Sequence, residues 1–389
     1  MSSSIQRVGP AAGTGLSCLC VLAFCMACGR GEPAPGAGVS DSAATGGAVA
    51  DRELVLIDSI GVELGDSCYV FGSIESVSHG PDGDIYVMDR VMSCVRRYTP
   101  DGDFVLQYGK LGSGPGEMTN PLSMATLNEA GVAVCAAYQG GIHLYSYDGE
   151  WQGLRAGFSN NPPLYMVGAG DSSYIASKLT IEAQEGQPVA EMVVGRYRVD
   201  STEPDVVYRS DSFLFDPSDL SEFLRRTFFA YVYTADSRGN VYVAPYSTED
   251  YLIQCFSPDG ELIRTISMDV PRVERSEEEI QEEADFVNTR VRNMGAQGVA
   301  FNYRPEPYRQ MVTGLGVDAE GNLWARRGTE SVPFFDVFDP ADGSRLYGCV
   351  LRMSPSEGPY YTIIVDEGGF LAYHQNPEGF QKLYLLGLD

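Results

Sequence analysis

The chain has 389 residues, of which 44% are hydrophobic, so it can bury a large core and differs in composition from a disordered chain. Its 53 acidic residues outnumber its 27 basic residues, and the formal net charge is −26. Because phosphate backbones require clusters of Lys and Arg, which this sequence lacks, the charge argues against nucleic acid as a partner and indicates a well-solvated surface.

The N-terminal residues have the composition of a secretory signal. Residues 1–28 contain no acidic side chain and one arginine, Arg7, and they end in an apolar run. Residues 29–52 are rich in Gly, Ala, Ser and Pro, which predicts a flexible linker and not part of a core. We therefore expect the ordered domain to span residues 53–389.

Residues 22–29 resemble the lipobox of bacterial lipoproteins, in which a small residue precedes a cysteine that receives diacylglycerol. Ala27, Cys28 and Gly29 match this pattern, whereas Cys25 stands where leucine is usual. The resemblance implies lipidation at Cys28 and contact with a membrane through that lipid. Simple secretion and an uncleaved membrane anchor are the alternatives, the latter with an apolar run that is short for a span and interrupted by glycines.

Internal repetition is the main signal along the rest of the chain. In the first unit, residues 75–79 precede a Pro-Asp-Gly turn, residues 85–88 and 94–98 alternate as strands, and a second Asp-Gly turn leads into residues 104–108. The related units lie at residues 128–149, 168–199, 236–263, 317–343 and 365–386. Units of about 40 residues with four short strands predict an all-β, six-bladed β-propeller.

The ends of the chain predict how this propeller closes. The last unit stops after a third-strand sequence, residues 382–386, while residues 53–60 form the first ordered strand. We expect the N-terminal strand to complete the last blade and to hide its edge.

Two segments between the repeats predict helices. Residues 216–226 begin with Asp216 as a helix N-cap and a proline at the first helical position. Ser276 and Glu279 form a capping box for a second helix over residues 276–294. Connections between blades emerge where the innermost strands begin, so both helices are expected to cover part of one channel mouth. Packing without a gating role is the alternative.

The repeats resemble the NHL-repeat, six-bladed propeller lipoproteins of Gram-negative bacteria. The resemblance depends on residues 81–89, on the turn at residues 98–102 and on the glycine-rich residues 109–118. It implies the fold and a place in the cell envelope: a monomer, lipid-anchored at the outer membrane, with its propeller in the periplasm or at the surface. It implies little about function.

Five cysteines lie outside the signal, and they occur singly in strand-like runs without a C-x-x-C pair. They are Cys68, Cys94, Cys135, Cys255 and Cys349. This spacing argues against a metal cluster or a redox motif and favours unpaired, buried side chains, with one or two disulfides as the alternative.

The histidines give two candidate binding residues. His79 follows an innermost strand and His374 begins a loop between strands, so each can approach a mouth of the channel. His143 lies in a third strand and is interpreted as structural. Because the three histidines belong to different repeats, they form no local metal-binding motif.

A further candidate surface precedes the innermost strand of the fifth repeat. It places Tyr303, Arg304, Tyr308 and Arg309 beside the expected helical cover. Aromatic and guanidinium groups at a channel mouth suit the recognition of sugars, peptides or carboxylates, with proline-rigidified packing as the alternative.

Carboxylates recur at the first turn of several repeats and are interpreted as turn formers and not as acids or bases. They are Asp82, Asp236, Asp318, Glu320, Asp366 and Glu367.

The sequence favours a binding or scaffold module for a protein, peptide or glycan ligand, because it combines an anchor, a linker and a propeller without a catalytic constellation. No cofactor is expected for that role. The alternative is a metal-dependent lyase or a lactone or ester hydrolase with a divalent cation in the central channel, since NHL-like propellers include such enzymes. An electron-transfer protein would need a haem or quinone signature, which the sequence lacks.

Overall fold

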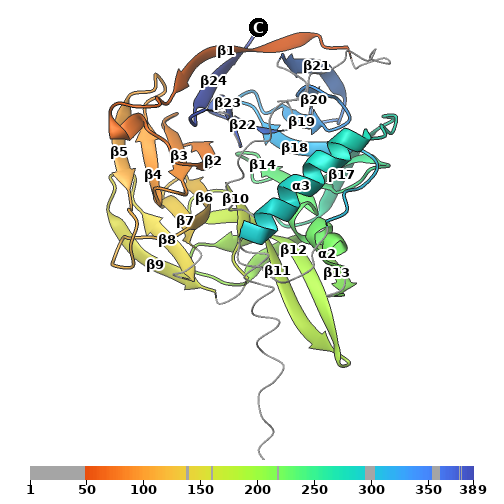
Figure 1. The fold of residues 1–389 in the computed structure, drawn as a ribbon, viewed down its shortest axis with the longest axis horizontal. Coiled ribbons are helices and arrows are strands. Elements are labelled where there is room, and N and C mark those ends of the chain that lie inside the picture. The colour runs from red at the N-terminus through yellow and green to blue at the C-terminus, as the bar shows by residue number, and fades with distance from the viewer. Residues whose placement is uncertain are drawn as a thin grey trace, which may run out of the picture.

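The computed structural model describes residues 49–389 apart from residues 137–139, 159–160, 217–218, 294–302, 353–359, 376 and 378. The predicted signal, Cys28 and most of the predicted linker therefore lie outside the described residues. Within them, strands predominate and the helices are few: a short 3-10 helix, η1 (Ser67–Tyr69), and the α-helices α2 (Leu220–Phe228) and α3 (Glu277–Asn293). The fold is an all-β propeller (Figure 1).

Strands β2 to β21 form consecutive groups of four antiparallel neighbours. Group 1 contains β2 (Ile74–His79), β3 (Ile85–Asp89), β4 (Cys94–Tyr98) and β5 (Phe104–Tyr108). Group 2 contains β6 (Pro121–Leu127), β7 (Gly131–Ala136), β8 (Gly141–Tyr145) and β9 (Trp151–Gly157). Group 3 contains β10 (Leu164–Gly168), β11 (Ser173–Gln184), β12 (Gln187–Arg198) and β13 (Pro204–Leu214). Group 4 contains β14 (Tyr231–Ala235), β15 (Val241–Pro245), β16 (Tyr251–Phe256) and β17 (Leu262–Met268). Group 5 contains β18 (Val312–Val317), β19 (Leu323–Arg327), β20 (Phe334–Phe338) and β21 (Arg345–Leu351).

The last group is built from both ends of the chain. Group 6 contains β22 (Tyr361–Asp366), β23 (Gly369–His374), β24 (Leu383–Leu388) and the N-terminal strand β1 (Arg52–Ile60). As expected, β1 pairs antiparallel with β24, where Leu54 faces Leu388. It also pairs in parallel with β21, where Leu54 faces Leu351. Groups 5 and 6 are therefore joined through β1 into one eight-stranded sheet, beside four separate four-stranded sheets.

The first strands of the groups lie innermost and surround the centre of the ring. Strands β2, β6, β10, β14, β18 and β22 contact one another in a closed cycle, and Figure 1 shows them at the centre of the ring. Neighbouring first strands run in the same direction where their ends meet. Thr126 near the end of β6 contacts both His79 at the end of β2 and Gly168 near the end of β10. Gly316 near the end of β18 lies against Val365 near the end of β22. We call the end where the first strands begin the helix mouth, and the end where they finish the turn mouth.

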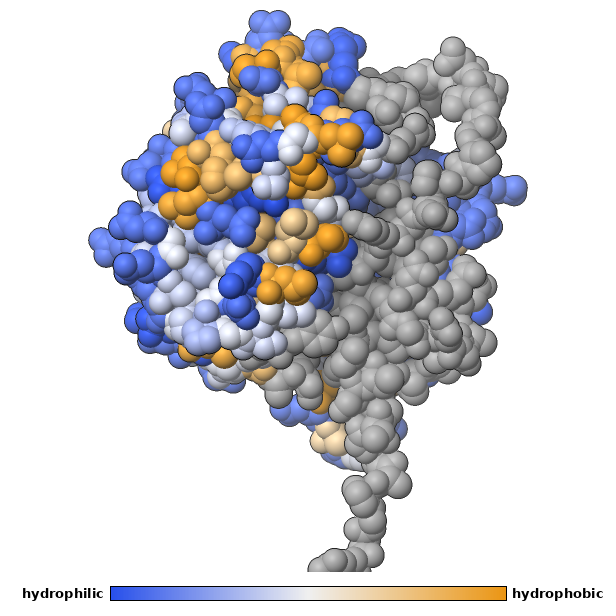
Figure 2. Space-filling model, turned by 60° about the vertical axis from the view of Figure 1, so that its left-hand side comes forward, coloured by the Kyte–Doolittle hydropathy of each residue, from blue (hydrophilic) through white to orange (hydrophobic). Residues whose placement is uncertain are grey.

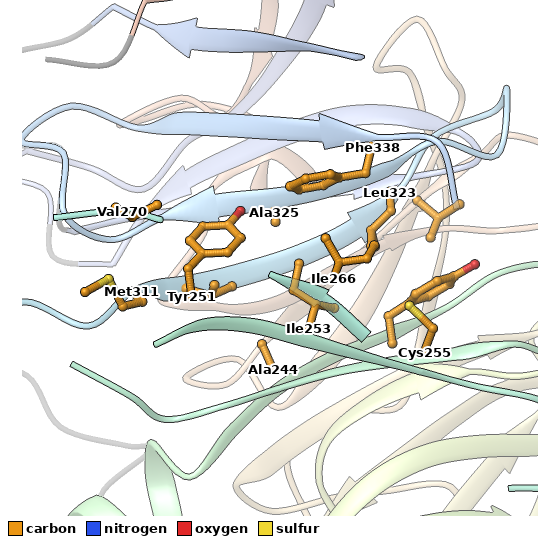
Figure 3. Packing of buried hydrophobic residues seen from close by; sticks show 13 residues of the cluster. Ala244, Tyr251, Ile253, Cys255, Ile266, Val270, Met311, Leu323, Ala325 and Phe338 are labelled. Carbon is orange, nitrogen blue, oxygen red and sulfur yellow. The ribbon is translucent and has the colours of Figure 1, made fainter. Parts of the chain in front are cut away.

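Apolar side chains pack between neighbouring groups. Between groups 4 and 5, Tyr251 of β16 meets Phe338 of β20 with ring centroids 6.4 Å apart, and Ile253 and Leu323 are fully buried beside them (Figure 3). Successive residues of a strand point to opposite faces of its sheet, so each sheet contributes side chains to the interface with the group on either side. Four of the single cysteines lie in such strands and are buried: Cys94, Cys135, Cys255 and Cys349. Cys68 differs from the prediction, because it lies half-buried in η1 and not in a strand. All five are free thiols.

The Pro-Asp-Gly turns form as the repeats predict. The amide of Gly102 donates to the carbonyl of Thr99 at 2.9 Å, and the amide of Gly260 donates to the carbonyl of Ser257 at 2.9 Å. Both glycines have φ near +90° (89° and 87°), which a residue with a Cβ adopts only under strain.

Three boundaries differ from expectation. Helix α2 begins at Leu220 and not at residue 216, because the side chain of Asp219 caps the amide of Glu222 at 3.1 Å. Asp219 therefore takes the N-cap position predicted for Asp216, whose carbonyl accepts the Asp219 amide at 3.1 Å. Strand β1 already begins at Arg52, one residue inside the predicted linker. In group 3, β11 and β12 have 12 residues each and project beyond the ring, which the short repeat did not predict (Figure 1).

The surface mixes polar and apolar side chains. Figure 2 shows apolar residues as separate patches among hydrophilic ones on the side formed by groups 1 and 2. Isolated apolar side chains of this kind are normal on soluble domains. Within the described part of the chain, no helix is both long enough and apolar enough to span a membrane.

Candidate functional site

Helix α3 lies at the helix mouth, and its capping box holds its start. The Ser276 hydroxyl accepts the Glu279 amide at 3.1 Å, and the Glu279 carboxylate accepts the Ser276 amide at 2.8 Å. The same carboxylate pairs with Arg309, which precedes β18. Figure 1 shows α3 running diagonally in front of the strands of groups 4 and 5. The helix thus forms a partial cover over one mouth, and its capping residue also fastens it to the propeller.

A second ion pair secures the middle of the cover. Arg275 lies 2.6 Å from the carboxylate of Glu283 on α3. Burial and then the Glu283 carboxylate raise the pKa of Tyr303. Burial also raises the pKa of Tyr360, which directly precedes group 6, with smaller contributions from Glu282 and then Glu283. Glu283 therefore lies close to side chains that approach the mouth from two different parts of the chain.

Two of the four candidate residues before β18 use their polar groups within the protein. Tyr303 is 3% exposed, and its amide donates to the side chain of Asn288 on α3 at 2.9 Å. Arg309 donates to the carbonyl of Thr329 at 3.0 Å, in addition to its ion pair with Glu279. These contacts make Tyr303 and Arg309 part of the attachment of α3.

The other two candidate residues lie nearer the solvent. Arg304 is exposed, and its backbone is held by α2: its amide donates to the hydroxyl of Ser221 at 3.1 Å, and its carbonyl accepts from Arg225 at 2.8 Å. Tyr308 is half-buried, with the guanidinium carbon of Arg272 3.7 Å from its ring centroid. Arg304 and Tyr308 therefore present a cation and an aromatic ring beside the helix mouth.

The two candidate histidines lie at opposite mouths. His374 ends β23 at the helix mouth, where its ring meets Tyr361 edge-on at 4.9 Å. His79 ends β2 at the turn mouth, where its Nδ1 lies 2.5 Å from the carboxylate of Asp366. Tyr361 and Asp366 are the two ends of β22, which spans about 16 Å at the usual rise of a strand. One metal ion could not be shared by both histidines.

The pair formed by His79 and Asp366 joins the first and last groups. The Asp366 carboxylate also accepts the amide of His79 at 3.1 Å and the amide of Gly368 at 3.0 Å. A Cβ added to Gly368 would lie 2.2 Å from the His79 ring, so this glycine allows the ring to seat. Glu367 accepts the amide of Ser237 from group 4 at 3.0 Å. Asp366 thus positions an imidazole, a role that the sequence did not reveal.

Two of the other first-turn carboxylates, Asp236 and Asp318, form turns as predicted. Asp236 accepts from the amides of Arg238 and Asn240 at 3.0 and 2.8 Å. Asp318 accepts from the amide of Asn322 at 2.8 Å and from the indole nitrogen of Trp324 at 2.8 Å. Among the described residues, no group of three or more His, Cys, Asp or Glu side chains has the geometry to hold a metal ion.

Side chains bridge neighbouring groups around the channel wall. In each bridge a side chain of one group donates to a first-strand carbonyl, or to the carbonyl just before a first strand, in a neighbouring group. The bridges run from Thr126 to His79 at 2.7 Å, Ser123 to Pro163 at 3.0 Å, Tyr233 to Leu164 at 2.7 Å, Arg326 to Tyr361 at 2.6 Å and Tyr373 to Glu75 at 2.9 Å. These bonds tie neighbouring groups together at their innermost strands.

No protein-family model and no curated protein matches this chain. Solved structures resemble it at low identity. A member of the DUF4221 family from Bacteroides vulgatus is 10% identical with a TM-score of 0.47, covering 87% of this chain and 98% of its own. Regucalcin, a calcium-binding protein from Agrobacterium tumefaciens, is 11% identical with a TM-score of 0.42, covering 85% and 93%. A β-propeller domain from Myceliophthora thermophila is 11% identical with a TM-score of 0.39, covering 86% and 99%.

Proposed function

We propose that this chain is a six-bladed propeller of the NHL-like kind that binds a protein, peptide or glycan ligand from the cell envelope. The closed cycle of six first strands supports the blade number. In this interpretation the eight-stranded sheet is two blades, because its strand order changes from group 5 to group 6 at β1. Strand β1 then closes the ring by completing the last blade, which leaves no unpaired edge there.

The observation that carries the binding role is the chemistry beside the helix mouth. Arg304 is exposed there on a backbone held by α2, and Tyr308 lies under the guanidinium of Arg272. Aromatic and arginine side chains on a rigid frame supply much of the energy at binding surfaces, because little conformational entropy is lost when they bind.

A pull-down from envelope extract tests this role. The wild-type protein should retain a partner or glycan that a variant with Arg304→Ala and Tyr308→Ala releases, identified by mass spectrometry. Arg238→Ala is the matched control, because Arg238 is also exposed but lies at the turn mouth. Equal retention by the double variant and the wild type would contradict a role for this face.

The alternative function is a hydrolase or lyase, and His79 with Asp366 favours it. A carboxylate 2.5 Å from Nδ1 orients an imidazole so that Nε2 can take a proton or a metal ion. Native mass spectrometry before and after chelation tests it: one divalent ion per chain, lost with His79→Ala, would support the enzyme. A chain that carries no divalent ion in this experiment would favour the ligand-binding role over the enzyme.

The anchor is part of the proposal. A lipid on Cys28 would hold the chain at the outer membrane, with residues 29–51 as a tether. Intact mass and membrane fractionation of the parent and of Cys28→Ala test it. An unchanged membrane-bound fraction in the variant would refute lipidation at Cys28.

A further inference from the structure

Large apolar side chains are exposed at high density where the described part of the chain begins. Six of the 19 exposed large apolar residues among the described ones lie within residues 49–64, which we call the apolar run. They are Val49, Val55, Leu56, Ile57, Val62 and Leu64. Their exposed fractions range from 38% for Val55 to 87% for Leu64. Single exposed apolar residues are normal, but a concentration of them on a soluble domain indicates a contact surface.

The centre of the apolar run is the outermost strand of group 6. Strand β1 pairs with β24 along its length, but it pairs with β21 only through Arg52, Glu53 and Leu54. From Val55 onward, its outer edge has no strand partner within the described part of the chain. Figure 1 shows β1 along the rim of the ring, away from the innermost strands. The exposed residues of β1 therefore lie on the rim and not at either mouth.

Two features of β1 oppose pairing with a further strand. Its register with β24 shifts between Leu56 and Asp58, as it does at a β-bulge. The carboxylate of Asp58 accepts the amide of Ser59 at 2.7 Å, so that donor is already occupied. Bulges and edge charges protect an open sheet edge from an added strand. The exposed side chains therefore fit a partner that contacts side chains, and not a peptide or a second copy that pairs with the backbone.

The charges narrow the chemistry of that partner. Carboxylates within the run are used by the protein itself: Asp51 accepts the amide of Gly348 at 2.9 Å, and Glu53 lies 2.9 Å from the guanidinium of Arg352. The net charge of −26 still opposes contact with an anionic surface. An apolar layer beneath zwitterionic head groups satisfies both conditions, because it accepts aliphatic side chains and adds no negative charge.

The apolar run is also the first described segment after the proposed tether. The predicted linker joins Cys28 to Val49. A Gly-rich linker of about 20 residues has an r.m.s. end-to-end distance of about 25 Å, so a lipid on Cys28 would keep the run close to the bilayer. Tethering raises the effective concentration of the bilayer at the run, and a contact too weak to hold the protein by itself then becomes populated.

We propose that the apolar run, centred on Leu56 and Ile57, docks on the zwitterionic surface of the lipid bilayer that holds the tether. The proposal rests on the lipid anchor given under the proposed function. Exposed aliphatic side chains gain free energy when they leave water for the interfacial layer of a bilayer. Because β1 lies on the rim, the ring then stands edge-on to the bilayer, and both mouths stay open to the aqueous compartment. This orientation leaves Arg304 and Tyr308 accessible to a ligand.

Quenching by brominated lipid tests the contact on the full chain, extracted from membranes and reconstituted in phosphatidylcholine vesicles. Leu64→Trp places a reporter at a position that is 87% exposed. Brominated acyl chains should quench this reporter beyond the background of the two native tryptophans, which the wild type measures. Ile263→Trp, exposed on β17 of group 4, is the control reporter and should show background quenching only. Added phosphatidylglycerol should weaken the Leu64→Trp quenching, and stronger quenching would overturn the zwitterionic preference.

A pair of double variants in the Leu64→Trp background separates docking from anchoring. Leu56→Asp with Ile57→Asp should lower the ratio of docked to undocked protein by at least about tenfold, because two apolar contacts are lost. Leu262→Asp with Ile263→Asp is the matched control, since these are also adjacent exposed residues of an outer strand, and it should leave quenching unchanged. Melting curves confirm that each variant is folded.

Sedimentation with the vesicles reports the anchor separately from the docking. Protein that sediments without quenching of the Leu64→Trp reporter overturns the docking and leaves the anchor standing. Equal quenching in the two double variants also overturns the docking. Protein that does not sediment refutes both the anchor and the docking.

Discussion

Strand β1 joins the beginning of the chain to its end, and one leucine tests how much that junction stabilises the fold. Leu54 is 1% exposed and packs among residues of β20, β21 and β24, whereas Leu56 on the same strand is 61% exposed. Replacing a fully buried leucine by alanine costs about 2–5 kcal/mol, from lost burial and from the cavity that remains. An exposed leucine should cost no more than about 0.5 kcal/mol.

We therefore expect Leu54→Ala to lower the free energy of unfolding by about 2–5 kcal/mol and Leu56→Ala to leave it nearly unchanged. Urea denaturation followed by circular dichroism measures both variants against the wild type. The slope of the free energy with urea must stay the same, so that a shifted midpoint reports stability and not a change in the unfolded state. If the two variants lose equal and small amounts, β1 does not stabilise the junction between the two groups, and the closure argument fails.

Other predictions concern single contacts. Asp318→Ala should cost about 1–3 kcal/mol, because the buried indole N–H of Trp324 loses its acceptor; an unchanged urea midpoint in tryptophan fluorescence would contradict this. Burial and neighbouring glutamates raise the pKa of Glu282, so its ionised form destabilises the fold above that pKa. Glu282→Gln should therefore raise the melting temperature at pH 7. It should not do so at pH 3, where the wild-type side chain is already neutral. Burial raises the pKa of Cys94 to about 12 and the pKa of Cys255 to about 11. Iodoacetamide should therefore alkylate these thiols at pH 8 only after the protein unfolds. Alkylation of native protein at the same rate as unfolded protein would show that these thiols are accessible.

The strand pattern was predictable because it depends on local chemistry. Alternating side chains and Pro-Asp-Gly turns specify strands such as β3 and β4 within one repeat, and the same turn glycines recur with positive φ. The pairing of His79 with Asp366 was not identified, although ring closure places the first and last repeats side by side. To predict this pair, one must recognise both that His79 and Asp366 each end a first strand and that these two strands are neighbours in the closed ring.

The conformation of Tyr165, whose φ is +51°, could not be predicted in the same way. Nothing in the sequence around Tyr165 requires positive φ, since tyrosine normally avoids it. The strain arises because Ser123 and Tyr233, from separate groups, hold the carbonyls on its N-terminal side. The length of β11 and β12 in group 3 was not predictable either, because these strands are longer than the corresponding strands of the other groups.

The two mouths place different constraints on function. At the turn mouth, Asp366 accepts two backbone amides as well as the imidazole of His79, so a change there disturbs the contact between the first and last groups together with any chemistry. At the helix mouth, Arg304 is exposed on a main chain that Ser221 and Arg225 hold, so its side chain can change while the fold stays intact. Loss of activity after a turn-mouth mutation therefore needs a stability measurement before it is assigned to catalysis, whereas loss of binding after Arg304→Ala points to the binding face itself.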